Sequence, residues 1–191
     1  DTELRAGEEG RLQLTADPAP DTGWVGLLQR DPAMGWRELN AWRLVGEGSR
    51  DSWEWIEAQG LACVTDFAPG SGARVLAAER VRVELAGGRT TSAVAEGSVR
   101  VESDDQWAEG DRLSFSGGSQ SFSLMPAEGR RVSVGTTEVT CVCDALESAD
   151  GGNVSARGNV GGVLRRGALW GAADSPMRFA ADSALVSRRG D

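Results

Sequence analysis

The feature that most constrains the fold is an alternation of apolar and polar residues that recurs along the chain. It is clearest at residues 81–85 (VRVEL), 99–102 (VRVE), 113–116 (LSFS) and 122–124 (FSL). Successive side chains of a β-strand point to opposite faces, so this period of two predicts strands with one apolar face. No segment after residue 52 shows the stripe of an amphipathic helix. We expect a mainly β chain, with less than about one tenth helix against the usual third.

Turn-forming pairs separate the alternating segments. Glycine and aspartate supply the backbone conformations of tight hairpin turns. Their spacing suits consecutive antiparallel strands rather than strand–helix–strand units. The pairs lie at residues 70–72, 87–88, 104–105, 117–118, 151–152 and 161–162.

Two short patterns alternate along the sequence. A glycine in the middle of a strand weakens it, so its regular recurrence in the first pattern predicts a bulge or bend where the sheet curves. Repeated strand pairs are typical of a roll whose units stack to share one core. The first pattern, Ala-x-Gly-x-(Val/Ala), occupies residues 58–62, 95–99 and 156–160, with a degraded copy that carries an extra residue at 127–132. The second, (Ala/Gly)-(Asp/Glu)-x-apolar-x-apolar, occupies residues 78–83, 110–115 and 181–186.

Three segments show this alternation most clearly: residues 97–101 (GSVRV), 109–115 (EGDRLSF) and 156–160 (ARGNV). In these segments the chain resembles the lipopolysaccharide-transport family of LptA/OstA-like periplasmic proteins, and the resemblance covers roughly residues 52–191. It implies an antiparallel β-jelly-roll, or "taco", of repeated strand pairs whose groove holds the acyl chains of lipid or lipopolysaccharide. It also implies end strands that join protomers edge to edge, and a place in the periplasm or cell envelope of a Gram-negative bacterium. The chain departs from the family in lacking Lys, in its Trp-rich start and in its Cys-x-Cys.

Residues 1–51 differ in composition from the rest of the chain. They contain Trp24, Trp36 and Trp42, and prolines at positions 18, 20 and 32 interrupt any long element. We expect an irregular segment or short strands here, and the β-jelly-roll over residues 52–191.

The composition excludes most catalytic machinery, because the chain has no Lys, His or Tyr. It therefore has no Ser-His-Asp or Cys-His relay, no Schiff-base lysine and no phosphate-loop lysine. Carboxylates are the common acid–base groups left, and nothing singles out a pair among the 29 acidic residues. We expect a protein that is not an enzyme and has no cofactor.

The sequence favours no metal site. Three cysteines without histidine do not complete a tetrahedral zinc site within one chain. Glu102, Asp104 and Asp105 offer oxygens for Ca²⁺, but without a loop of alternating acids they favour a solvated turn.

The charge and hydropathy of the chain bear on its partners. A formal net charge of −9 argues against nucleic-acid binding, which needs a basic face. The longest apolar runs are a few residues, so we expect neither a transmembrane helix nor a signal peptide in this sequence.

The alternation assigns side chains to the two faces of the sheet. We expect the apolar set to line a lipid-binding groove, in which burial of CH₂ groups needs no catalytic residue. The same set also suits a closed core, as in a structural or interaction β-roll such as an adhesin or envelope scaffold. The apolar set is Val81, Val83, Leu85, Val99, Val101, Leu113, Phe115, Phe122 and Leu124. The outward set is Arg80, Arg82, Glu84, Arg100, Arg112 and Ser114.

The three cysteines leave their redox state open. Cys141 and Cys143 lie two apart, on one face of a strand, where extended geometry opposes a mutual disulfide. Cys63 can pair with either across a sheet, or all three can be free thiols.

The C-terminal strand, residues 177–186, is predicted to be a poorly protected edge. It has no proline and only Arg178 and Asp182 as charges, whereas unpaired strand edges bind other strands unless something blocks them. We expect weak self-association or a β-edge partner there, reduced by proline at Ala184, with the Trp-rich region covering the other end.

Overall fold

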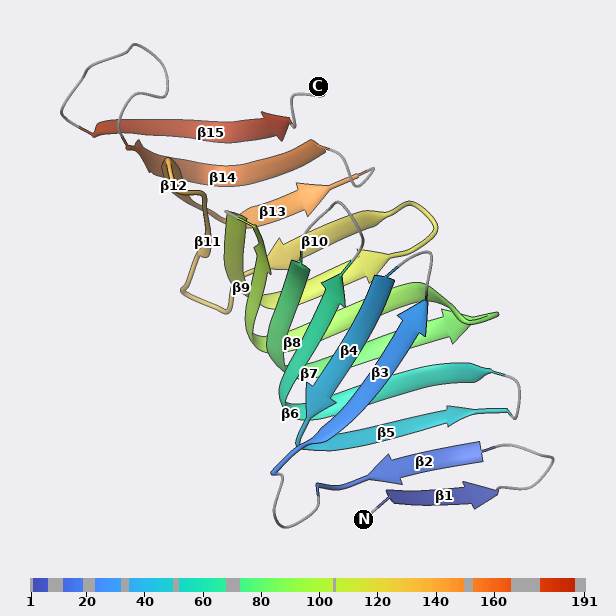
Figure 1. Ribbon diagram of the computed structural model, residues 1–191. Coiled ribbons are helices and arrows are strands. Elements are labelled where there is room, and N and C mark those ends of the chain that lie inside the picture. The colour runs from blue at the N-terminus through green and yellow to red at the C-terminus, as the bar shows by residue number, and fades with distance from the viewer. Residues whose placement is uncertain are drawn as a thin grey trace.

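The computed structural model consists of a single antiparallel sheet of fifteen strands (Figure 1). It describes residues 2–6, 12–18, 23–31, 35–49, 52–67, 73–104, 106–149, 153–165 and 176–187, and no helix occurs among them. This confirms the expected mainly β roll. The shorter strands are β1 (Thr2–Ala6), β2 (Leu12–Ala16), β3 (Val25–Asp31), β4 (Gly35–Ala41), β5 (Arg43–Gly48), β10 (Ser121–Met125), β11 (Val132–Gly135), β12 (Val139–Cys143) and β13 (Ala145–Ser148). The longer ones are β6 (Trp53–Phe67), β7 (Ala73–Ala86), β8 (Arg89–Ser103), β9 (Gln106–Ser116), β14 (Asn153–Leu164) and β15 (Met177–Ser187).

The sheet is folded along a crease into two layers, and each long strand crosses from one layer to the other. The first layer contains β1, β2, β5, β10 and β13, with the halves of the long strands that pair with them. The second layer contains β3, β4, β11 and β12 with the other halves. In Figure 1 the steeply inclined half-strands of the second layer lie in front of the flatter ones of the first.

Glycine bulges make the crease. In β6, the register against β7 shifts between Gln59 and Ala62, and the two residues between them, Gly60 and Leu61, have φ of 72° and 49°. Two successive left-handed residues turn the strand sharply, and glycine adopts that conformation at little cost. The same geometry recurs in β8 at Gly97–Ser98 and in β14 at Gly158–Asn159. The predicted bend at the Ala-x-Gly-x-(Val/Ala) pattern is therefore confirmed.

The second sequence pattern supplies the residue opposite each bulge. Each two-residue bulge faces a single acidic residue on the next strand. These residues lie on the outside of the crease and are exposed or half-buried. The acidic residues are Glu79 opposite Gly60–Leu61, Asp111 opposite Gly97–Ser98, and Asp182 opposite Gly158–Asn159. The two alternating patterns are thus the two sides of one recurring corner.

One corner of the roll is irregular. Where β10 ends and β11 begins, residues 126–131 replace the bulge, and Gly129 has a φ of 73°. Val132 is fully buried, as the degraded copy at residues 127–132 requires. The regular copies begin with a buried alanine, but here Ala127 is only half-buried and Leu124 is the buried residue before the turn. The irregular corner therefore begins three residues earlier than the sequence pattern predicts.

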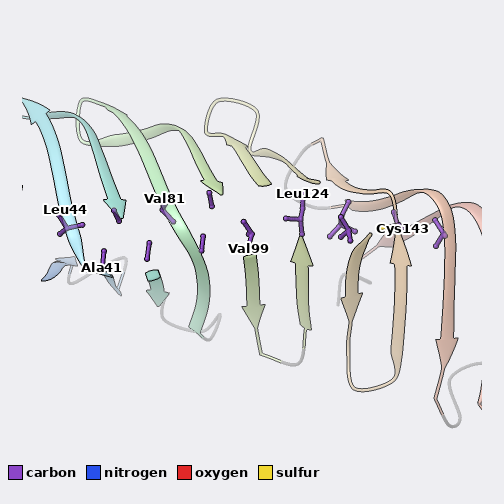
Figure 2. Close-up of a cluster of buried hydrophobic side chains, with 14 of the residues drawn as sticks. Ala41, Leu44, Val81, Val99, Leu124 and Cys143 are labelled. Atoms are coloured by element: carbon purple, nitrogen blue, oxygen red, sulfur yellow. The ribbon is translucent and has the colours of Figure 1, made fainter. Parts of the chain in front are cut away.

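The core runs along the inside of the crease, as a line of buried side chains that crosses the strands (Figure 2). Many of these side chains are alanines, and small side chains let two layers approach closely. In the first layer the row is in register across ten strands, and only Leu113 and Ala184 in it are half-buried rather than buried: Ala16, Leu44, Ala58, Val81, Ala95, Leu113, Leu124, Leu146, Ala156 and Ala184. The second layer contributes Ala41, Ala62, Ala78, Val99, Val132, Cys143 and Val160.

The N-terminal segment, residues 1–51, forms strands of five to seven residues. These strands continue the sheet, since β4 and β5 both pair with β6. β4 and β5 are the two halves of one bent strand, with Trp42 at the corner between them. The Trp-rich start is thus an integral part of the roll.

Candidate lipid-binding face

The surface between the two layers, which we call the inner face, carries no charge close to the crease. Next to the core row of the first layer lies a second row in register: Leu14, Gly46, Ile56, Val83, Ala93, Phe115, Phe122, Ser148, Val154 and Val186. The matching row of the second layer is Leu27, Leu39, Val64, Leu76, Val101, Ala108, Val134, Cys141, Gly162 and Phe179.

Burial falls with distance from the crease. Core side chains such as Val81 and Val99 are 1% exposed, whereas the neighbouring Val83 and Val101 are only half-buried. In a closed sandwich, side chains that face the opposite sheet are buried on both sides. The half-burial of these rows shows that the layers do not close over them in the part of the roll from β6 to β9.

The roll is more closed near β12 and β13. In the same second rows, Cys141 is 8% exposed and Ser148 is 3% exposed. The inner face is therefore more accessible from β6 to β9 than at β12 and β13.

The nine apolar residues predicted from the alternation all lie on this inner face, but they divide into two groups. Val81, Val99 and Leu124 are fully buried in the crease, where no ligand reaches them. The other six are half-buried and accessible: Val83, Leu85, Val101, Leu113, Phe115 and Phe122. Val99 and Val101 belong to the second layer, and the remaining seven belong to the first.

Sequence reasoning missed most of the second layer. Leu39, Val64 and Leu76 lie in one row with Val101, opposite the predicted residues. The alternation is weak there, since residues 75–78 (VLAA) are apolar on both faces. Only the pairing of β6 with β4 and β7 shows that Leu39, Val64 and Leu76 lie on the same face of the sheet.

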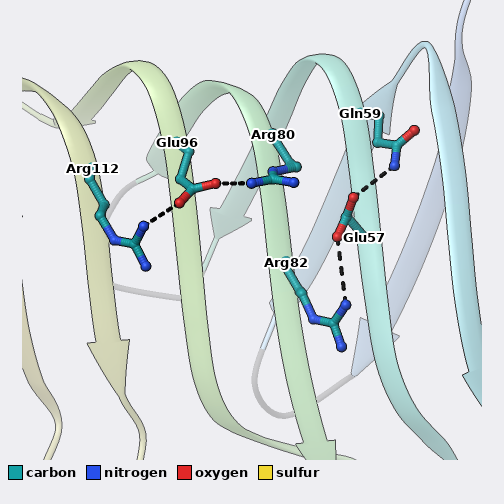
Figure 3. A network of polar contacts seen from close by, with 6 residues as sticks. All are labelled: Glu57, Gln59, Arg80, Arg82, Glu96 and Arg112. Carbon is teal, nitrogen blue, oxygen red and sulfur yellow. Dashed lines mark hydrogen bonds and ion pairs between the residues drawn. The ribbon is translucent and has the colours of Figure 1, made fainter. Parts of the chain in front are cut away.

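The outer face carries a ladder of ion pairs across the strands (Figure 3). The carboxylate of Glu96 binds the guanidinium groups of both Arg80 and Arg112, on the two neighbouring strands. The hydrogen bond from Arg80 holds the pKa of Glu96 below its usual range. These contacts satisfy charged groups on the solvent side, so the outer face is the solvated one.

A second group on the outer face centres on Arg82. Its Nε donates to Glu84 at 2.8 Å, its Nη1 lies 3.7 Å from Glu57, and its guanidinium lies 4.4 Å over the ring of Trp55. Glu57 also accepts a hydrogen bond from Gln59 at 2.7 Å.

All six residues predicted to point outward do so. Arg100 pairs with Glu102 and Glu109, and Ser114 lies in the outer row beside Val94. The remaining outward residues are Arg80, Arg82, Glu84 and Arg112.

The described residues contain no group of three side chains placed to hold a metal ion. Of the acids considered for Ca²⁺, Glu102 is paired with Arg100, and Asp104 lies in a turn. Asp105 lies outside the described residues. The same part of the chain has no helix with the length and apolar character needed to cross a bilayer.

The cysteines lie on opposite faces of the sheet. Cys141 and Cys143 are buried free thiols on the inner face of β12, and burial raises the pKa of both. Cys63 is half-buried and belongs to an outer row with Asn40 and Ala77. A disulfide between Cys63 and either inner cysteine, one of the alternatives the sequence left open, is therefore wrong, and the structure has three free thiols.

No model of a known protein family matches the chain, and none of the curated proteins matches it either.

Proposed function

We propose that this protein binds the acyl chains of a lipid on its inner face and acts by burial rather than by catalysis. The observation that carries the proposal is the burial gradient between β6 and β9. There, uncharged rows in both layers face one another yet remain half-buried. An apolar chain that covers them removes its own surface and theirs from water.

The energetics suit a ligand without specific polar contacts. Each CH₂ group removed from water contributes about 0.8 kcal/mol, so a chain of a dozen such groups gains several kcal/mol after its ordering cost. The accessible part of the rows crosses four strands, β6 to β9, which lie about 4.8 Å apart, so it extends for about 14 Å along the crease. A dodecyl chain can lie along this part of the inner face.

A role in lipid transport across a cell envelope is the further part of the proposal. It is supported by the resemblance to LptA/OstA-like proteins and by the free outer edge of β15, which pairs only with β14 among the described strands. An open edge offers the means to continue the inner face into a partner.

A matched pair of variants tests lipid binding. Val83 and Val94 are half-buried valines on neighbouring strands, but Val83 is on the inner face and Val94 on the outer face. We expect Val83→Glu to weaken laurate binding at least about tenfold, since it buries a charge under the chain. Val94→Glu should change it less than about twofold.

Calorimetric titration below the micelle concentration measures the binding, and circular dichroism checks the fold of both variants. Native mass spectrometry of protein taken from cells adds a search for a bound lipid. Absence of laurate binding by the unmodified protein, or equal effects of the two variants, contradicts the proposal.

The second candidate is an interaction module with a closed interior. It is favoured by the burial of Cys141 and Ser148, which shows that the layers do close near β12 and β13. This candidate predicts no laurate binding by the unmodified protein, so the same experiment separates the two functions.

A further inference from the structure

The rim of the inner face in the second layer is charged, in contrast to the rows beside the crease. Arg37, Asp66 and Arg74 lie side by side on β4, β6 and β7, one step outward from Leu39, Val64 and Leu76. Ser103 and Gln106 continue this rim without charge.

The charges of the rim are not balanced. Arg37 binds Asp66 through both Nε and Nη2, at 3.2 Å each. Arg74, the neighbour of Asp66 on the other side, is exposed and has no ion pair with the described residues. It is the one arginine on the described inner face that is free to bind an anion.

An anionic group is therefore attracted to this rim at Arg74, which is exposed and has no ion pair with the described residues.

From the unpaired Arg74 beside these uncharged rows we infer that the inner face takes an amphiphile with one anionic head group, and that Arg74 binds the head group at the rim. The inference rests on the proposed lipid binding and adds the class and the orientation of the ligand. The head group is a carboxylate or a phosphate monoester, since a guanidinium binds either through two parallel hydrogen bonds.

The path from the rim to the core suits such a ligand. Arg74, Leu76 and Ala78 alternate along one face of β7, so the head group lies about 13 Å from the crease. The apolar side chains between these two places bury the start of the acyl chain. The rest of the chain then follows the rows beside the crease.

The test compares three amphiphiles with the same chain: laurate, dodecyl phosphate and the neutral dodecanol. We expect Arg74→Gln to weaken binding of at least one anion about tenfold and to leave dodecanol within about twofold. If Arg74→Gln loses affinity for laurate alone, the head group is a carboxylate, and if it loses affinity for dodecyl phosphate alone, the head group is a phosphate. Loss of affinity for both anions supports one site that takes either head group.

The control is Arg89→Gln, which removes an exposed arginine from the β7–β8 hairpin, away from the inner face. It should leave all three affinities unchanged. If the anions bind and Arg74→Gln has no more effect than Arg89→Gln, the head-group site is wrong while lipid binding stands. If none of the three amphiphiles binds, the proposed function itself fails.

Discussion

Gly97 on β8 and Glu79 on the neighbouring strand β7 are in contact on the outside of the crease: a Cβ on residue 97 would lie 2.6 Å from the carboxyl carbon of Glu79. Gly97 also has a φ of 79°. The position thus combines a backbone conformation that favours glycine with a neighbour that leaves no room for a side chain.

We predict that Gly97→Ala destabilises the roll by about 2–4 kcal/mol, measured by urea unfolding. Gly88→Ala is the matched control, because Gly88 has a φ of 74° but no atom within 4 Å of the added Cβ. It should cost only about 1 kcal/mol, the conformational part. In a Glu79→Gly background, which also removes the Cβ of residue 79 that would lie 2.8 Å from the added Cβ, the cost of Gly97→Ala should fall to that of the control. If Gly97→Ala and Gly88→Ala cost the same in the unmodified protein, the contact with Glu79 has no energetic role.

The ladder at Glu96 predicts a dependence of stability on pH. Hydrogen bonds from Arg80 lower the pKa of Glu96 in the folded state, so the folded protein binds this proton less readily than the unfolded chain. The stabilisation is present above the unfolded pKa of glutamate and is lost as pH falls through the lowered folded value. Glu96→Gln should therefore reduce stability at pH 7 and flatten its decline below about pH 4.5.

Unfolding midpoints from pH 7 to pH 3 measure this difference, and high salt should diminish it. If stability falls as steeply toward pH 3 in Glu96→Gln as in the unmodified protein, the pH dependence comes from other carboxylates.

The thiols are predicted to differ in reactivity. Cys141 and Cys143 are buried, with pKa values raised by burial, so little thiolate is accessible at pH 8. Iodoacetamide should label half-buried Cys63 first and the two inner cysteines only after unfolding. Peptide mass spectrometry measures the order, and rapid labelling of Cys143 in the native protein contradicts the closed packing around β12.

The free edge of β15 predicts weak, concentration-dependent association. Leu185 is 69% exposed on this strand, whereas Ala184 packs against the core. Leu185→Lys is therefore a cleaner test than proline at Ala184, because a lysine protects an edge without disturbing the interior. Sedimentation velocity should show less association for Leu185→Lys. A strict monomer at high concentration in the unmodified protein removes the physical support for an edge-to-edge bridge.

The sequence was most informative where local geometry decides the structure. The alternation in residues 81–85 and 113–116 predicted the correct face for each side chain, because the register of a strand fixes the face on which every side chain lies. The repeated glycines marked the bulges, because Gly60 and Gly97 adopt a conformation that other residues avoid.

What the sequence did not reveal depends on pairing between distant segments. Trp42 forms a corner without a glycine of its own, since the bulge lies on the neighbouring strand at Gly60. The face of Cys63 is fixed by a register shift that only the pairing of β6 with β7 defines. The rim formed by Arg37, Asp66 and Arg74 likewise joins three strands whose order the alternation does not specify.

The regular corner also makes the length of this protein adjustable. A bulge and its facing acidic residue recur in β6, β8 and β14, and none of the three depends on how many strands precede it. Duplication or loss of a hairpin therefore changes the length of the inner face by about 10 Å, which is two strand spacings. The contacts within each remaining corner stay the same. Gene duplication can therefore lengthen the sheet in whole hairpins, and the length of the inner face can evolve without a new core.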